Sequence, residues 1–280
     1  IFAPTVADRA AKPYEPLTGQ AWLKRELARD DHDRWAGGQH PRGTVELPKG
    51  RVIAVEPVKL PARVSVTGPR GEEHFLSSWG LYAGDEFEGR YLLHTLRSPA
   101  NKKNANANFG FRAKRFQLHG RAGRAGSGLL MAGAQCSVVE DVNFSEFFQV
   151  ALTIDKGSRS VTLSRLNIRN GTAGRGARQP RGIAVAMQGV TGLRGENLSF
   201  LLCERGVVAA GSRGLSFDTV FCEKVDRPFT FGAGCKAVTV TNAIIQAPGV
   251  GWPREEGWEW DRVIFDLRKN GGGISANGFL

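Results

Sequence analysis

Short runs of alternating apolar and polar residues repeat through the middle of the chain. Between Gly128 and Gly249 they form five consecutive segments of 22, 32, 24, 22 and 22 residues. Each segment opens with one alternating run, such as GIAVAM at Gly182, turns through Gly or Ser, and continues with a second run, such as GLSF at Gly214. A third apolar pair follows near an Asn or Asp. Three short strands per segment predict one triangular coil per segment.

The segments align so that apolar residues recur in fixed columns, as inward-facing residues of stacked strands would. One pair of columns holds Leu152, Ile183, Val207 and Phe229, then Ile154, Val185, Ala209 and Phe231. A second pair holds Val161, Leu193, Leu215 and Val238, then Val139, Leu163, Phe217 and Val240, and a third face carries Val142, Leu166, Leu198, Val220 and Ala243. This double period predicts an all-β, single-stranded parallel β-helix, a solenoid in which each coil buries its inner face against the next. The alternative is a β-sandwich or barrel with evenly spaced strands, which has no reason to keep one column order through five segments.

Composition agrees with this architecture and excludes several classes of site. Glycine makes up 36 of 280 residues, well above the usual share of about 7%, as expected if every coil needs corners with positive φ. No apolar run approaches the roughly 20 residues of a membrane span, and no secretory signal peptide is visible. The four cysteines lack CxxC spacing and the five histidines are scattered, so we expect no metal site, Cys/His nucleophile or cofactor. Most cysteines are interpreted as buried small residues, and a bridge between Cys203 and Cys222 would need adjacent coils to bring them together.

The N-terminal section has a different pattern. Residues 1–18 are rich in Pro and without period, which indicates an arm or linker, whereas Gly19–Trp35 has the spacing of one short amphipathic helix. A Gly-rich turn, GTVELPKGRV at Gly43 and PVKLPARVSVTG at Pro57 follow. This order resembles the beginning of the right-handed β-helix domains of phage tailspikes and pectate-lyase-like proteins. The resemblance implies a right-handed solenoid and a virion context.

These patterns divide the chain into three expected regions. The arm covers residues 1–18, a capping helix and its following turn cover 19–42, and the parallel β-helix covers 43–280. The helix would close the end of the first coil, whose strand edges would otherwise invite aggregation. Two irregular stretches, at about 72–109 and 170–181, are interpreted as insertions between coils, and such loops often carry the ligand-facing surface.

Charge indicates the kind of partner. The chain has 38 Lys and Arg against 27 Asp and Glu, a formal net charge of +11, which attracts polyanions. Arginines gather in or beside loops, and we take these as candidate glycan-binding residues: Arg121, Arg124, Arg175, Arg178 and Arg181. Nucleic acid is disfavoured because no DNA- or RNA-binding module is recognisable. An anionic bacterial surface polysaccharide suits a long ridged surface better, although basic loops that only solubilise the protein are the alternative.

Tryptophans are the other candidate sugar contacts. Trp79 lies in the first irregular stretch, and Trp252 and Trp258 lie among acidic residues near the C-terminus. Exposed indole rings stack on sugar faces and also anchor protein interfaces. For the C-terminal pair, a solenoid cap or a subunit contact is favoured over a sugar platform.

Glu196 and Asp218 are the candidate catalytic pair. They share a predicted column with Glu140, Ser164 and Thr241 on neighbouring coils. At a spacing of about 4.8 Å they could meet the separation of a retaining glycosidase, and repulsion would raise one pKa. The alternative is that both are solvated turn residues or anchors for arginines. The paired Asp with GHG and the WIDH-type strand of related polygalacturonases and pectate lyases are absent, so the resemblance does not imply a plant-cell-wall enzyme.

Three functions remain open from the sequence. The leading hypothesis is a homotrimeric phage virion spike or receptor-binding protein, at the tail or capsid surface and otherwise extracellular, that recognises an anionic bacterial glycan. The second is a tailspike-like depolymerase, a glycoside hydrolase or lyase, although we favour a protein without enzymatic activity. The third is a structural virion component that contacts other virion proteins.

Overall fold

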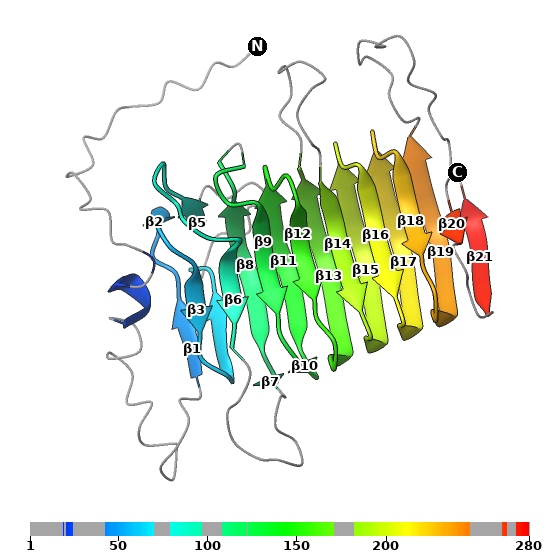
Figure 1. Ribbon diagram of the computed structural model, residues 1–280, viewed down its shortest axis with the longest axis horizontal. Coiled ribbons are helices and arrows are strands. Elements are labelled where there is room, and N and C mark those ends of the chain that lie inside the picture. Colours follow the sequence, from blue (N-terminus) through cyan, green and yellow to red (C-terminus); the bar gives the residue numbers. More distant parts are fainter. Residues whose placement is uncertain are drawn as a thin grey trace.

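The computed structural model describes residues 19, 21–24, 43–69, 79–96, 108–121, 123–170, 182–246, 265–267 and 273–279. They form a right-handed parallel β-helix whose coils stack along one axis (Figure 1). Apart from a helical segment at residues 21–24, the described elements are strands. The predicted fold class is confirmed. Within these ranges, no helix is long and apolar enough to cross a membrane.

The strands belong to two parallel sheets. The larger sheet has 13 strands: β1 (Gly43–Glu46), β2 (Arg51–Ala54), β4 (Val64–Thr67), β5 (Gly80–Ala83), β7 (Asn108–Phe109), β8 (Arg112–His119), β10 (Ala134–Gln135), β11 (Val138–Ser145), β13 (Arg159–Arg169), β15 (Thr191–Leu201), β17 (Arg213–Glu223), β19 (Lys236–Gln246) and β21 (Ile274–Phe279). The smaller sheet has 8: β3 (Val58–Leu60), β6 (Tyr91–Thr95), β9 (Ser127–Met131), β12 (Val150–Ile154), β14 (Ile183–Gln188), β16 (Arg205–Ala210), β18 (Arg227–Phe231) and β20 (Phe265–Leu267).

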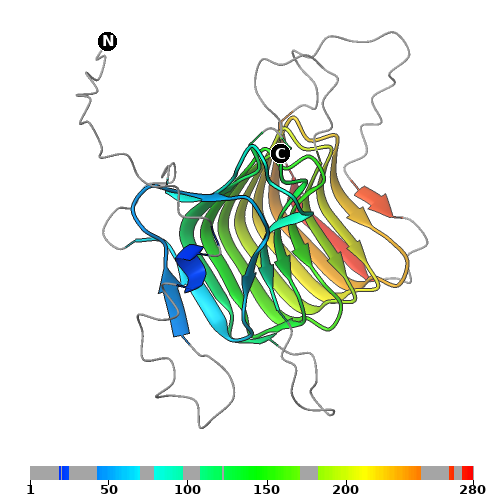
Figure 2. The same cartoon turned by 60° about the vertical axis from the view of Figure 1, so that its left-hand side comes forward.

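The larger sheet bends in the middle of its long strands. A column of residues at the bend has left-handed backbone: Asp141, Arg165, Asn197, Thr219 and Asn242, with φ between 50° and 55°. Asn and Asp tolerate this conformation, which is why the turn column is rich in them. The bend divides one continuous ladder into two faces, and the smaller sheet supplies the third. The result is the triangular coil that the sequence predicts, seen toward its N-terminal end in Figure 2.

Strand register confirms most of the predicted columns and corrects one pair. Val161, Leu193, Leu215 and Val238 pair in order, and so do Leu198, Val220 and Ala243. In the smaller sheet, however, Leu152 pairs with Val185 and Ile154 pairs with Met187, so the sequence alignment was wrong by two residues in this segment. A slip of two keeps every side chain on the same face, so alternation alone cannot detect it.

The stacked inner faces form one continuous hydrophobic core. Its packing is complementary from coil to coil, as the contacts of Phe217 illustrate. Phe217 lies with Phe229 and Phe231 in one aromatic cluster, at centroid distances of 6.4 Å. On the neighbouring strand Gly195 leaves the space that Phe217 fills, because a Cβ there would lie 2.9 Å from its ring. Close packing of this kind ties each coil to the next.

The helical segment packs against the first coil. Trp22 and Leu23 are buried in the core, and a Cβ at Gly19 would lie 2.4 Å from a methyl carbon of Val58. Figure 2 shows the segment in front of the N-terminal end of the stack. The described residues thus fit the capping role expected for Gly19–Trp35, although the limits of the three predicted regions stay predictions.

Part of the predicted first insertion belongs to the solenoid. Residues 72–109 contain β5, β6 and the short β7, which pair with other strands, so this stretch is not a single irregular loop. Its strands are only two to five residues long and lack the 22-residue period, which hid them in the sequence. Most of the second insertion, residues 171–181, lies outside the described residues. All four cysteines are free, so Cys203 and Cys222 form no bridge.

Thr219 is a β-branched residue in the left-handed column, with φ of 55°. We expect Thr219→Asn to raise the free energy of unfolding by roughly 0.5–1 kcal/mol, because Asn adopts this backbone at lower cost. Thr239→Asn, on the next strand in regular backbone, is the control and should give no gain. Equilibrium urea denaturation measures both, and equal effects of the two substitutions would contradict this account of the corner.

Candidate functional site

A polar ladder runs along the outer face of the larger sheet, before the bend. Strand register places Glu140, Ser164, Glu196, Asp218 and Thr241 opposite one another in this order. The column predicted from the sequence is confirmed. It is the first of two surfaces that could carry function.

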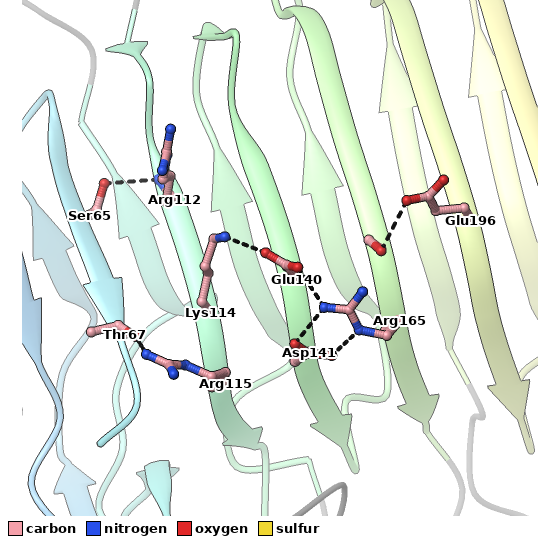
Figure 3. Close-up of polar contacts among 10 residues, drawn as sticks. Ser65, Thr67, Arg112, Lys114, Arg115, Glu140, Asp141, Arg165 and Glu196 are labelled. Atoms are coloured by element: carbon pink, nitrogen blue, oxygen red, sulfur yellow. Dashed lines mark hydrogen bonds and ion pairs between the residues drawn. The ribbon is translucent and has the colours of Figure 1, made fainter. Parts of the chain in front are cut away.

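Charged side chains connect the coils at the N-terminal end of this ladder (Figure 3). Arg165 Nη2 lies 2.5 Å from Glu140 Oε1, and Arg165 Nε lies 2.5 Å from Asp141 Oδ1. Lys114 Nζ pairs with the other oxygen of Glu140. The hydrogen bond from Lys114 is the largest cause that lowers the pKa of Glu140, and Arg165 adds to it. Because Arg165 is exposed, each pair contributes at most about 1 kcal/mol, and the network serves as a surface link between coils.

Glu196 and Asp218 are neighbours in the ladder, but each has its own partners. Arg194 Nη2 lies 2.9 Å from Glu196 Oε2, and Ser164 Oγ donates to Glu196 Oε1 at 3.3 Å. A dashed line in Figure 3 marks the hydrogen bond that Glu196 accepts. These contacts match the interpretation of Glu196 as an anchor for a neighbouring arginine.

Asp218 is held in its charged form by hydrogen bonds. Thr241 Oγ1 donates to Asp218 Oδ1 at 2.7 Å and Asn242 Nδ2 donates to the same oxygen at 2.9 Å. These bonds, that from Thr241 foremost, lower the pKa of Asp218. From the sequence we expected charge repulsion to raise the pKa of one member of the pair. At Asp218 the hydrogen bonds act in the opposite direction, and the pKa is lowered. Asp218 is therefore unsuited to be the protonated acid, and catalysis by the pair stays a prediction.

A second surface lies on the same sheet beyond the bend. It is a groove of about 520 Å³, here called the polar groove, lined by Arg51, Ile53, Tyr82, Gln117, His119, Arg121, Asn143, Ser145, Asn167 and Arg169. All but Arg121 occupy alternate, outward positions on β2, β5, β8, β11 and β13. Register aligns them in two columns, Arg51–Gly80–Gln117–Asn143–Asn167 and Ile53–Tyr82–His119–Ser145–Arg169. The groove therefore crosses the coils and runs along the solenoid axis.

Tyr82 is the centre of a stacked group in the groove. Its ring stacks on His119 at 5.0 Å between centroids, and the guanidinium carbon of Arg51 lies 5.0 Å from its centroid. Burial raises the pKa of Tyr82 although Arg51 opposes the shift, so the phenol stays protonated. Tyr82 Oη donates to Gln117 Oε1 at 3.0 Å, and Gln117 Nε2 donates to Ser145 Oγ at 3.2 Å. The chain of bonds fixes these side chains before any ligand arrives.

His119 is presented as a neutral hydrogen-bond donor. The backbone N–H of Arg121 donates to His119 Nδ1 at 3.0 Å, so the proton of the neutral ring sits on Nε2. Burial is the main cause that lowers the pKa of His119, and Arg51 and Arg121 add to it. Glu146 acts against this shift.

The polar groove offers positive charge and few acceptors. Three guanidinium groups line it, and its ten described lining residues include no carboxylate. Arg121 pairs with Asp85, next to the groove, at 3.1 Å, so Arg51 and Arg169 are the lining arginines that form no ion pair with a carboxylate of the described residues. One acceptor stands out: Asn167 Oδ1 is buried and has no hydrogen-bond partner within the described part of the chain. A buried polar atom without a partner is costly, and a ligand hydroxyl would satisfy it. The groove suits an anionic, hydroxyl-bearing ligand.

The predicted glycan-binding residues fall in different places. Arg121 lines the polar groove, and Arg124 is exposed on the same turn. Trp79 is half-buried, with Lys49 Nζ 5.5 Å from its ring centroid. Arg175, Arg178, Arg181, Trp252 and Trp258 lie outside the described residues. No group of described His, Cys, Asp or Glu side chains is arranged to hold a metal ion.

Sequence reasoning missed Arg51, Tyr82 and His119. The alternation in RVIA at Arg51 and GLYA at Gly80 marks outward positions, but nothing local indicates that these strands are neighbours. Only the register of β2, β5 and β8 brings the three side chains together.

Comparisons with known proteins establish the fold alone. No protein-family model and no curated protein matches the sequence. A predicted glycosyl hydrolase from Parabacteroides merdae has a similar structure, with TM-score 0.50 and 14% identity over 81% of this chain and 92% of the other. A tailspike of Acinetobacter phage vb_AbaP_AS12 gives TM-score 0.44 and 12% identity over 84% of this chain and 40% of the tailspike. A Geobacillus virus E2 protein gives TM-score 0.42 and 11% identity over 88% of this chain and 55% of that protein. The Parabacteroides merdae protein thus shares this β-helix fold.

The lowered pKa of Asp218 has a consequence for stability. Since its folded-state pKa lies below the unfolded value, the charged form contributes stability above the unfolded pKa, and this is lost as pH falls through the folded pKa. We expect Asp218→Asn to be slightly less stable than wild type near neutral pH and equal to it in strong acid. Thermal unfolding midpoints of both proteins, measured from neutral pH to strong acid, test this. A difference between the two midpoints that does not change with pH would contradict it.

Proposed function

We propose that this chain is a virion spike or receptor-binding protein that binds an anionic bacterial surface polysaccharide in the polar groove. The observation that carries the proposal is the set of three arginines, of which only Arg121 is paired with a described carboxylate, that of Asp85, while no carboxylate lies among the described lining residues. A net charge of +11 would draw a polyanion toward this surface. The virion context rests on the likeness of the N-terminal section to tailspike domains.

The shape of the groove favours a chain over a small anion. Its lining comes from five adjacent strands, and four steps of about 4.8 Å make a site of about 19 Å along the axis. Amide, hydroxyl and imidazole groups lie between Arg51 at one end of the groove and Arg169 at the other, so neutral hydrogen-bonding groups lie between the charged ones. Asn167 would accept a hydrogen bond from a sugar hydroxyl.

Nucleic acid fits the groove less well. Single-stranded nucleic acids bind through bases stacked on open aromatic faces beside a basic track. Here Arg51 and His119 pack on the ring of Tyr82, which is only 5% exposed. The stack therefore positions its neighbours and offers no platform for bases.

Arg169 provides the sharpest test because its side chain is exposed and outward-facing. We expect Arg169→Gln to weaken polysaccharide binding about tenfold, since a hydrogen bond to a charged group contributes about 1.5–3 kcal/mol. The control is Arg213→Gln, an exposed arginine outside the groove. The measurement is retention of each variant on immobilised capsular polysaccharides and lipopolysaccharides from a bacterial panel, at a series of salt concentrations.

The same assay separates the competing functions. Retention that falls with salt, and falls further with Arg169→Gln only, supports the proposal. Absence of retention on every surface would overturn it and favour a structural virion component. Release of short oligosaccharides would indicate a depolymerase, and the double variant Glu196→Gln, Asp218→Asn would then test the predicted catalytic pair.

A further inference from the structure

The two columns that form the polar groove continue beyond it, and their chemistry changes. The first runs from Asn167 through Ser199 to Phe221 and Ile244, and the second runs from Arg169 through Leu201 to Glu223. These positions face outward, because the residues between them, such as Val220 and Cys222, are buried. The columns that line the groove therefore continue beyond it onto apolar side chains.

Apolar residues at these positions are not needed by the core. Ile244 is 42% exposed, and Phe221 and Leu201 are half-buried. Upstream in the column of Phe221, the same outward position holds Gln117, Asn143 and Asn167. A row of apolar side chains that are exposed or half-buried, in line with a binding groove, indicates a contact surface.

We propose that Phe221, Ile244 and Leu201 form an apolar subsite for the same polysaccharide chain that occupies the polar groove. The subsite holds the C–H face or the methyl groups of a neutral sugar, while the acidic sugars lie over the arginines. The inference rests on the proposed function. It assigns the ligand class more narrowly: an acidic polysaccharide whose repeat includes a neutral sugar with an apolar face, a 6-deoxy group or an acyl group.

Distance and charge support one continuous ligand. Phe221 lies two strands beyond Asn167, about 10 Å, and six strands beyond Arg51, about 29 Å, at about 4.8 Å per strand. Glu223, in the second column beside Phe221, would repel an acidic sugar. The order Arg169, Leu201, Glu223 thus limits the charged sugars to the groove and leaves the neutral sugar for the subsite.

A second copy of the chain is a weaker candidate for the occupant. A specific protein interface buries at least about 1,000 Å² in total. About half of that area comes from each partner. Three side chains that are themselves more than half buried offer less than this share, since even a whole aromatic side chain buries only about 150–250 Å².

The test uses oligosaccharides of increasing length, made by partial hydrolysis of the polysaccharide that the intact chain retains. Calorimetric titration should show that wild-type affinity rises once a fragment reaches from the groove to Phe221. We expect Phe221→Ala to remove that increase, a loss of about tenfold for long fragments, and to leave short fragments unchanged. Ile244→Ser should act in the same way. Phe109→Ala is the matched control, since Phe109 is 43% exposed and lies outside both columns.

Each result has a distinct meaning. Equal losses for short and long fragments, or no loss with Phe221→Ala and Ile244→Ser, would overturn the subsite while the groove proposal stands. A change in sedimentation coefficient with unchanged glycan binding would assign the patch to a subunit contact, which also overturns it. Absence of binding at every length, in wild type and variants alike, would overturn the proposed function and the subsite with it. Thermal unfolding of each variant confirms that it is folded.

Discussion

Each coil of this protein can bury its inner face only against the next coil, and the rest of the structure depends on that constraint. Parallel hydrogen bonding holds neighbouring strands in fixed register, from Gly43 paired with Val64 to Ala243 paired with Phe279. Register fixes the core, because Gly195 and Phe217 complement each other only when they are opposite. It also fixes the surface, because every outward residue acquires neighbours about 4.8 Å away on both sides.

The left-handed corner divides the surface into faces with different chemistry. Before the bend, Glu140 pairs with Arg165 and Asp218 accepts a hydrogen bond from Thr241, so the charged groups of that face have partners within the protein. After the bend, Arg51 and Arg169 have no carboxylate among the described residues that line the groove with them. The same repeating backbone thus carries one face that links coils and one that is suited to a charged ligand.

Preorganisation distinguishes the polar groove from the other basic surfaces. The stack of Arg51, Tyr82 and His119 and the bonds through Gln117 to Ser145 hold donors in place. Binding to fixed donors costs less conformational entropy than binding that must first order flexible loops of the protein. Along the solenoid axis this surface is charged at Arg51 and Arg169 and becomes apolar at Phe221 and Ile244.

The sequence by itself determined the solenoid, because a period of about 22 with alternation inside each run can be buried in only one way. It also placed Glu140, Ser164, Glu196 and Asp218 in one column, since the repeat, with its spacings of 24, 32 and 22 residues, extends to outward positions. Tertiary structure alone decided the pairing of Leu152 with Val185 and the grouping of Arg51, Tyr82 and His119. The physical reason is that alternation reports which face a residue occupies, whereas hydrogen-bond register, set by corners and insertions of variable length, decides which residues lie beside it.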